Sequence, residues 1–368
     1  MGETMRAVVK PARAPGAELR DVPIPVPGDH DVLIRVKATS MCGTDLHIFR
    51  WDHWAEENFG QTPMVFGHEY CGEVVEVGRD VSRVKVGDFV SGETHIGCGH
   101  CYLCRTGQQH LCINMELVGV TRPGCFAEYI CIPEQNAWIN PPDLPVDIAA
   151  IQEPFGNAVH TTLSGEIAAR STLVMGCGPI GLFSIGIARA SGASPIWAVD
   201  INDYRLELAR TMGATRVIDS REEDPVATIL AESDGAGAEV VLELSGAPAG
   251  IRQAFGALRV GGRISMLGLP SDPFEFDFSN FIVLKGANVH GIYGRKMFDT
   301  WYRTSTLLGN GLVDVSPLIT HHMPLEDFEK GMDLLLHGQA AKVILYPPSA
   351  TVPTASQAPS AARTSDSM

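Results

Sequence analysis

A glycine-rich turn constrains the fold of this chain more than any other feature. Gly176, Gly178 and Gly181 follow the apolar run 172–175 and open a segment of helical pattern. Glycines at these places permit a tight turn, close approach of a ligand to the backbone and close packing of helix on strand. The free N–H groups that begin the helix can hold phosphates. The pattern predicts a strand–turn–helix unit of a parallel sheet that binds a dinucleotide.

An acidic residue supports the dinucleotide interpretation and bears on which cofactor binds. Asp200 ends the next predicted strand, where a carboxylate can bind a ribose 2′-hydroxyl. Because a carboxylate repels a 2′-phosphate, it favours NAD over NADP, whereas Arg205 could tolerate NADP or pack along the adenosine. The alternative is an ordinary glycine-rich turn, with Asp200 capping the following helix.

The chain divides into parts of different pattern. The first half has short strands separated by turns, typical of an antiparallel β domain, whereas strands alternate with helices from about residue 161, typical of a parallel sheet. Two further helices and a closing strand, 341–346, should return to the first domain. We therefore expect an α/β protein with a β-rich domain at 1–160, a parallel-sheet domain at 161–294, a return segment at 295–346 and a disordered tail at 347–368, which is rich in Pro, Ala, Ser and Thr.

Charge and the N-terminal sequence narrow the classes of function. The 368 residues carry a formal net charge of −15, which disfavours nucleic-acid partners because phosphate backbones would be repelled. The N-terminus has no apolar run behind a basic start, and the uncharged stretch 172–188 is broken by glycine and proline. We expect a cytoplasmic protein with no membrane partner.

The cysteines indicate metal binding. Cytosolic thiols stay reduced, and the spacing C-x2-C-x2-C-x7-C within the segment of about residues 95–115 suits four thiolate ligands of a structural zinc. An iron–sulfur cluster or buried idle thiols are the alternatives. His100 and His110 lie close by, but four cysteines already complete a tetrahedral site. The expected ligands are Cys98, Cys101, Cys104 and Cys112.

A second set of possible metal ligands is scattered along the chain. Cys42 is followed by Thr44 and His47, and His68 and Glu69 form a Gly-His-Glu motif. Cysteine, histidine and carboxylate can hold a catalytic zinc that keeps one position open. Taken singly, His68 could be a core histidine and Glu69 a paired carboxylate, so spacing alone does not decide.

The run GHEYCGEVVEVGRDV, residues 67–81, resembles the signature of the zinc-containing medium-chain alcohol dehydrogenase superfamily. The cysteine cluster and the glycine turn follow in that superfamily's order, and the resemblance covers essentially residues 5–346. It implies a GroES-like β-rich catalytic domain with a structural-zinc lobe, followed by a Rossmann domain with a doubly wound parallel sheet.

Within the superfamily the chain is most similar to the bacterial L-threonine 3-dehydrogenases. The runs RPGCFAEY (122–129) and PFGNAVHT (154–161) are more typical of these enzymes than of polyol dehydrogenases. The resemblance implies L-threonine as the small-molecule substrate, NAD and two zinc ions as cofactors, and a homotetramer. A polyol or 2,3-butanediol dehydrogenase and a non-catalytic NAD-binding member of the fold are the alternatives.

The resemblance also implies roles for individual residues. Cys42, His68 and Glu69 match the catalytic-zinc ligands, although relatives differ on whether the third ligand is this glutamate or one from the position of Glu153. Thr44 and His47 match the proton relay. His95 could face the substrate or be a loop histidine, and Arg295 could reach a substrate carboxylate. The positions that match the cofactor site are Gly176, Gly178, Ile180, Gly181, Asp200, Arg205, Leu267, Gly268, Leu269, Ile292 and Tyr293.

Overall fold

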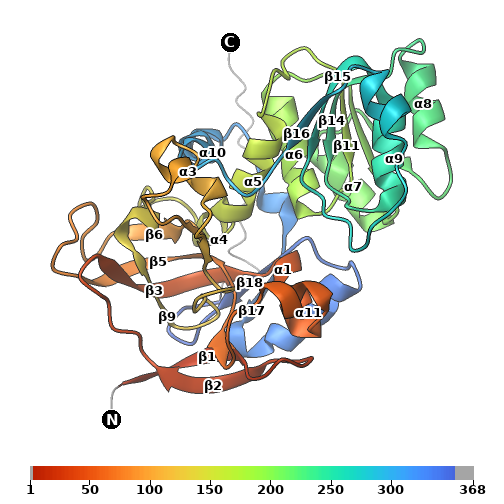
Figure 1. Ribbon diagram of the computed structural model, residues 1–368. Coiled ribbons are helices and arrows are strands. Elements are labelled where there is room, and N and C mark those ends of the chain that lie inside the picture. Colours follow the sequence, from red (N-terminus) through yellow and green to blue (C-terminus); the bar gives the residue numbers. More distant parts are fainter. Residues whose placement is uncertain (1–2, 353–368) are drawn as a thin grey trace, which may run out of the picture.

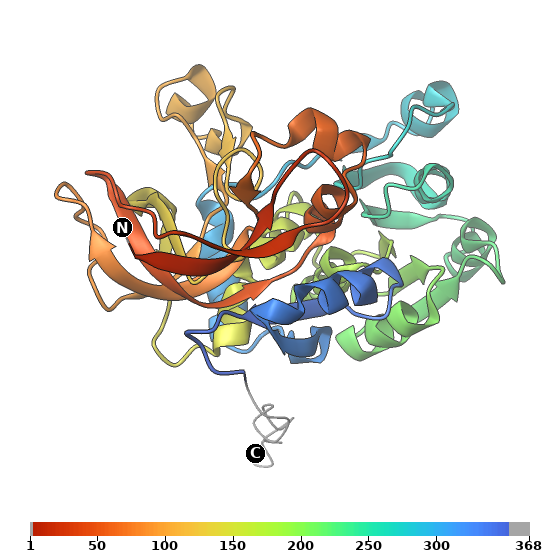
Figure 2. The same ribbon diagram turned by 90° about the horizontal axis from the view of Figure 1, so that it is seen from below.

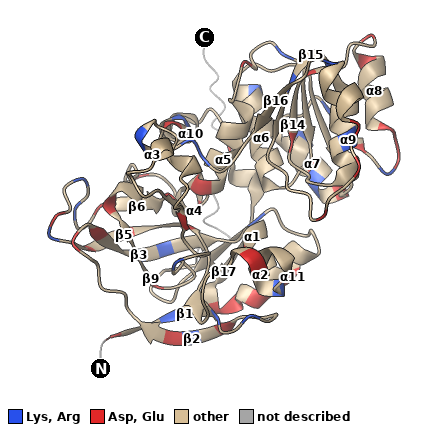
Figure 3. Ribbon diagram, viewed as in Figure 1, with Lys and Arg blue, Asp and Glu red and all other residues tan. Residues whose placement is uncertain are grey.

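The computed structural model describes residues 3–352, which form two lobes side by side (Figures 1 and 2). The first lobe contains the N-terminal half and the C-terminal strands, and the second contains the parallel sheet. Acidic and basic residues are interspersed over both lobes (Figure 3). Most of the tail for which we expect disorder, residues 353–368, lies outside the described residues. Within residues 3–352, no helix combines the length and the apolar character that crossing a bilayer requires.

The first lobe is built on a 7-stranded, mostly antiparallel sheet in the order β10-β6-β5-β3-β18-β17, with β9 pairing β3. A 3-stranded sheet, β2-β1-β4, and a 2-stranded one, β7-β8, complete it. The strands of the lobe are β1 (Thr4–Lys10), β2 (Glu18–Pro23), β3 (Asp31–Ser40), β4 (Met64–Val65), β5 (Glu69–Val77), β6 (Phe89–Gly92), β7 (His95–Ile96), β8 (Glu116–Leu117), β9 (Tyr129–Pro133), β10 (Ala137–Ile139), β17 (Ile319–Pro324) and β18 (Lys342–Tyr346).

The second lobe is a 6-stranded sheet in the order β13-β12-β11-β14-β15-β16, with every neighbouring pair parallel. The predicted parallel sheet is confirmed, and its order is that of a doubly wound dinucleotide-binding fold. Its strands are β11 (Thr172–Met175), β12 (Ile196–Asp200), β13 (Arg216–Asp219), β14 (Ala238–Glu243), β15 (Leu258–Met266) and β16 (Asn288–Gly291).

The alternation of side chains along β11 decides which helices cover each face of this sheet. Val174 packs with residues of α6 (Pro179–Ala190) and α7 (Asp203–Met212), whereas Leu173 and Met175 pack with α8 (Pro225–Glu232) and α9 (Pro248–Ala257). Successive residues of a strand point to opposite faces, so both faces of the sheet are buried.

The chain returns to the first lobe after β16. Helix α10 (Asp299–Gly309) packs on α5 (Gln152–Thr162), and its buried Trp301 stacks on Trp138 of β10. Strand β18 then lies between β3 and β17. The remaining helices are α1 (Gly43–Arg50), α2 (His53–Asn58), α3 (Tyr102–Arg105), α4 (Val146–Ala150) and α11 (Phe328–Leu336).

Candidate active site and metal centres

The pairing of β3 with β5 brings together residues that lie far apart in sequence. Ser40, at the end of β3, pairs with Glu69, at the start of β5. Cys42 therefore lies beside His68, and their Sγ and Nε2 atoms are 3.0 Å apart. One ligand atom from each of Cys42, His68 and Glu69 lies within 4.8 Å of the others. The antiparallel register thus assembles the three predicted ligands.

Cys42 is held at the start of α1 by a capping box. Its Sγ accepts a hydrogen bond from the Thr44 N–H (3.3 Å), while an Asp45 carboxylate oxygen accepts one from the Cys42 N–H (2.9 Å). This reciprocal arrangement satisfies two N–H groups that the helix cannot satisfy itself. The local sequence therefore fixes the direction of the Cys42 side chain.

Asp45 is a site residue that the sequence analysis missed. It is fully buried, and its Oδ1 lies 3.6 Å from His68 Nδ1. Neither atom has a hydrogen-bond partner in the described structure. Histidines that bind metal through one nitrogen commonly direct the other at a carboxylate, which fixes the ring. An acidic residue three positions after a helix N-cap was the signal that could have indicated Asp45.

The three candidate ligands influence one another's charge. Burial raises the pKa of Cys42. Burial alone would lower the pKa of His68, but the neighbouring Cys42 and Asp45 raise it well above its ordinary value. Burial raises the pKa of Glu69 to about 7, although Lys342 opposes this. A dense group of buried donors with mutually perturbed pKa values is typical of a functional site.

Glu69 is held from the opposite side by Lys342 of β18. The buried Lys342 ammonium forms an ion pair with Glu69 Oε2 and donates to the Met41 carbonyl at 2.8 Å. Glu69 Oε1 is buried and has no hydrogen-bond partner. One thiol, one imidazole and one carboxylate with an unsatisfied oxygen are a donor set that suits zinc.

Glu153 lies apart from this group of three, on the first turn of α5. It accepts a hydrogen bond from Thr94 Oγ1 (3.1 Å) and forms an ion pair with Arg295. The same Thr94 hydroxyl lies 3.2 Å from the His68 carbonyl oxygen, so the two acceptors share its one proton. Thr94 thus links Glu153 to the backbone of His68, whereas it is Glu69 that lies beside Cys42.

Arg295 is fully engaged by the protein. Its buried guanidinium donates to Glu93, Glu153 and the Asn157 side chain, and it contacts His95 Nδ1. Arg295 therefore has no free N–H group with which to bind a substrate carboxylate, contrary to the suggestion from sequence. His95 is buried in β7 between Arg295 and Tyr293, whose ring lies edge-on at 5.4 Å, so it is not an exposed loop residue.

Thr44 and His47 lie one turn apart on α1, on a common face. Thr44 is half-buried beside Cys42, and His47 is exposed. His47 Nδ1 bonds to Asp52, the N-cap of α2, so its other ring nitrogen faces away from this partner. The sequence analysis did not identify Asp52.

The glycine turn has the geometry that its sequence predicts. Gly176 has φ +95°, a conformation that side chains rarely adopt, and a Cβ on Gly181 would lie 2.0 Å from the Gly176 oxygen. A Cβ on Gly178 would meet no atom within 4 Å, so the space before α6 is open. An open N-terminus of a 12-residue helix next to a strand end is suited to a pyrophosphate.

Asp200 lies beside this turn and does not cap α7. Its carboxylate accepts hydrogen bonds from the backbone N–H groups of Cys177, Ile201 and Asn202. The side chain that caps α7 is that of Asn202, which accepts from the Arg205 N–H. The capping alternative for Asp200 is therefore wrong. A carboxylate has about four acceptor positions, so one remains for a ribose hydroxyl.

The other expected cofactor positions lie at the carboxyl ends of the same sheet. Ile180 and Arg205 are half-buried on α6 and α7, Leu267 and Gly268 follow β15, and Leu269 and Tyr293 are exposed, with Ile292 half-buried after β16. Carboxyl ends at the reversal of strand order are where such sheets bind ligands. Glu243, buried at the end of β14, was not identified from sequence; it accepts from the Ser245 and Gly246 N–H groups, and Gly268 packs against it.

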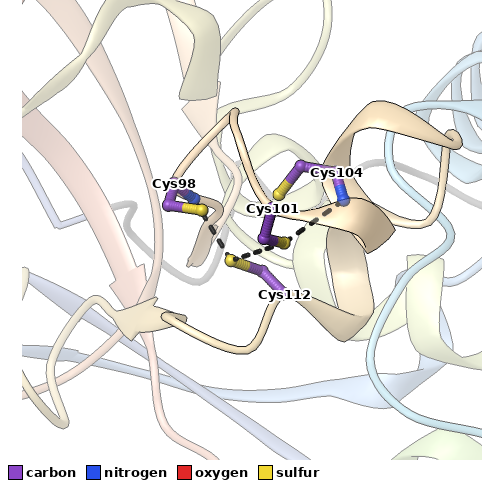
Figure 4. Close-up of side chains that lie close together, drawn as sticks. All are labelled: Cys98, Cys101, Cys104 and Cys112. Atoms are coloured by element: carbon purple, nitrogen blue, oxygen red, sulfur yellow. Dashed lines mark hydrogen bonds between the residues drawn. The ribbon is translucent and has the colours of Figure 1, made fainter.

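A second metal-binding group lies in the lobe around α3 (Figure 4). One ligand sulfur from each cysteine lies within 4.8 Å of the other three, and no cysteine forms a disulfide. Backbone N–H groups point at the sulfurs, as from Cys98 to Cys112 (3.2 Å) and from Cys104 to Cys101 (3.4 Å). Such bonds favour thiolates. The backbone N–H groups of His100 and Cys101, which follow Cys98, lower the pKa of Cys98 to about 6. The donor set suits a closed tetrahedral zinc site.

Comparison with known families fits both the fold and the donor sets. Residues 28–143 match the alcohol dehydrogenase GroES-like domain, and residues 179–310 match the zinc-binding dehydrogenase domain. The chain belongs to the zinc-binding alcohol dehydrogenase family. It is thus a zinc-binding oxidoreductase with a small-molecule substrate.

Individual relatives refine this placement. The L-threonine 3-dehydrogenase of Bacillus velezensis is 51% identical over 348 residues, 94% of this chain and 100% of that one. Among solved structures, the 2R,3R-butanediol dehydrogenase of Bacillus subtilis is 30% identical with a TM-score of 0.85, covering 93% of this chain and 99% of that one. An alcohol dehydrogenase from Escherichia coli CFT073, complexed with NADH, is 28% identical with a TM-score of 0.85, covering 94% and 100%.

Proposed function

We propose that this alcohol dehydrogenase oxidises the 3-hydroxyl of L-threonine to 2-amino-3-oxobutanoate, with NAD as the oxidant, in the degradation of threonine to glycine. The observation that carries the proposal is the group of Cys42, His68 and Glu69 within 4.8 Å, in a chain half identical to L-threonine 3-dehydrogenases over nearly its whole length. The geometry supports the reaction type, and the identity supports the substrate.

Two zinc ions and NAD each have residues in this chain that fit them. Cys42, His68 and Glu69 would hold the catalytic zinc, and the four-cysteine group would hold the structural one. Bound catalytic zinc supplies Lewis acidity, which makes an alcohol hydroxyl more acidic. NAD would lie across the glycine turn with its ribose at Asp200, and it supplies the acceptor for a hydride.

The side chains around this group provide a path for the hydroxyl proton. Thr44, half-buried beside Cys42, can accept the proton and pass it toward His47 on the next turn. His47 reaches solvent, and its bond to Asp52 orients the ring for proton exchange. Histidine suits this step because its ordinary pKa lies near neutral pH.

Glu153 completes the surroundings of the group without binding the metal directly. Arg295 compensates its charge, and Thr94 links it to the His68 backbone. We propose that the enzyme is a cytoplasmic homotetramer, as the resemblance to threonine dehydrogenases implies, which sedimentation of the purified protein would test.

The test of function is NADH formation by the zinc-replete protein with L-threonine, D-threonine, L-serine, sorbitol and 2,3-butanediol side by side. We expect L-threonine to give the highest kcat/KM. A higher value for a diol or polyol would leave the zinc and NAD chemistry but overturn the substrate. Absence of turnover with every alcohol, with NAD still bound, would favour a non-catalytic member of the fold.

A variant separates chemistry from cofactor binding. Replacing Cys42 by Ser should abolish turnover because serine is a poor zinc ligand, yet leave NAD binding, measured by fluorescence, nearly unchanged. Retention of wild-type kcat by Cys42→Ser would contradict the assignment of Cys42 as a zinc ligand.

A further inference from the structure

Arg263 of β15 is a buried basic residue that the proposed reaction does not use. It is 9% exposed and lies under the segment that connects α5 to β11, close enough to Gly165 that a Cβ there would be 2.9 Å from Arg263 Cδ. The residue follows Gly262 at the amino end of the parallel part of β15. The cofactor turn lies at the opposite, carboxyl ends of the same sheet.

Every hydrogen-bond partner of this guanidinium is neutral. Nη1 donates to Ser164 Oγ and Ser265 Oγ, both at 2.6 Å, and Nη2 donates to the backbone oxygens of Thr162 (3.2 Å) and Glu166 (3.4 Å). Nε is buried with no partner, and Arg263 forms no ion pair with any residue in the described range. Burial lowers its pKa to about 10. Buried charges are normally paired, so this one lacks its counter-ion.

A cavity of about 270 Å³ adjoins Arg263. Arg170 and Arg259 share its lining, and both form ion pairs with Glu239, while Arg170 also pairs with Glu166. Because Glu166 and Glu239 are paired with these two arginines, no carboxylate of the lining balances the positive charge of Arg263. Asn288 and His290 of the edge strand β16 also line the cavity.

We propose that this cavity binds a tetrahedral oxyanion, either free phosphate or the phosphate group of a small metabolite, as the counter-ion of Arg263. Guanidinium groups are the preferred protein partners of phosphate. The cavity is near the small end of the range for ligand sites, which fits an anion of this size. The site is independent of the substrate assignment, because none of its residues belongs to the metal or cofactor groups.

The position of the site gives the anion a structural effect. Arg263 donates to the Thr162 carbonyl at the end of α5, and the first turn of that helix carries Glu153. An anion that holds Arg263 in place would stabilise the connection between the lobes. Because a ligand that binds only the folded state stabilises it, the effect should saturate with concentration.

The experiment is a titration of the full-length, zinc-loaded protein with inorganic phosphate by calorimetry and by thermal melting, at ionic strength held constant with sodium chloride. We expect saturable binding and a rise in Tm. Arg263→Gln should weaken phosphate binding by at least about tenfold, the loss expected from removing a charged partner. Arg216→Gln, on the far edge strand β13, is the matched control and should bind as the wild type does. A parallel titration with glycerol 3-phosphate separates free phosphate from a phosphate monoester.

A second variant covers the case in which Arg263→Gln does not fold. Asn288 is exposed on β16, so Asn288→Asp should fold and weaken phosphate binding by placing a carboxylate at the cavity. An equal phosphate response in the wild type and both variants would overturn the proposal. So would the absence of saturable binding, equal stabilisation by acetate, or a phosphate effect that varies with protein concentration, since that would attribute it to assembly.

Discussion

Replacing Asp45 by Asn tests whether the buried carboxylate beside His68 controls metal binding. Asn keeps an oxygen that can accept from the Cys42 N–H, now bonded at 2.9 Å, but removes the negative charge 3.6 Å from His68 Nδ1. Loss of such a partner typically lowers metal affinity about 10–100-fold, or ~1.4–2.7 kcal/mol. Burial raises the pKa of Asp45, so its charge adds little to the stability of the fold, and loss of that charge should cost at most ~1 kcal/mol. We therefore expect a large fall in zinc affinity with a small fall in Tm.

The assay is competition for zinc with a chromophoric chelator, after the four-cysteine site has been filled. Asp203→Asn is the control, because Asp203 is also acidic and in the first turn of a helix, but lies on the exposed surface of the other lobe. This control should retain wild-type zinc affinity. If Asp45→Asn binds the catalytic zinc within about twofold of the wild type, the argument that Asp45 orients His68 is refuted.

Three further perturbations probe the cofactor site, the cysteine group and a buried acid. Asp200→Gly should lower the preference for NAD over NADP, measured as the ratio of kcat/KM values, by about tenfold or more, because a charged acceptor is lost; an unchanged ratio would remove Asp200 from that role. Cys104→Ser should release one zinc per chain and lower Tm by about 4–8 °C, the shift that ~2 kcal/mol produces, whereas Cys131→Ser should retain both metals; equal metal content in the two variants would contradict the assignment. Burial raises the pKa of Glu243, so its ionisation disfavours the folded state as pH rises above the ordinary glutamate pKa. Glu243→Gln should therefore raise Tm at about pH 8 and lose this advantage toward about pH 4, and a difference in Tm that does not vary with pH would count against this account.

The elements that local pattern governs were predictable from sequence. Strand 172–175 was predicted with the bounds that the structure gives, because a short apolar run between turn signals indicates a buried strand and marks both of its ends. Strand β15, which begins at Leu258, has a weaker sequence pattern. Gly261 and Gly262 interrupt it, and glycine weakens the strand pattern that the prediction used.

The ligands at the candidate sites could be named from sequence, but their supporting residues could not. The Lys342–Glu69 pair joins residues 273 positions apart, and the Arg295–Glu93 pair joins residues 202 apart. No local pattern encodes such contacts, because they arise only when β18 and the segment after β16 return to the first lobe. Asp45 could have been predicted, because an acidic residue three positions after a helix N-cap commonly forms a capping box.

The central place of β18 has a consequence for biosynthesis. Since β18 pairs with β3 and supplies Lys342 to Glu69, the first lobe cannot close its sheet or neutralise that carboxylate until almost the whole polypeptide has left the ribosome. The parallel-sheet lobe, whose strands are contiguous in the chain, can fold earlier. A fragment that stops after β16 should consequently yield a folded nucleotide-binding lobe attached to an incomplete catalytic one, and recruitment of the catalytic metal should be a late event in maturation.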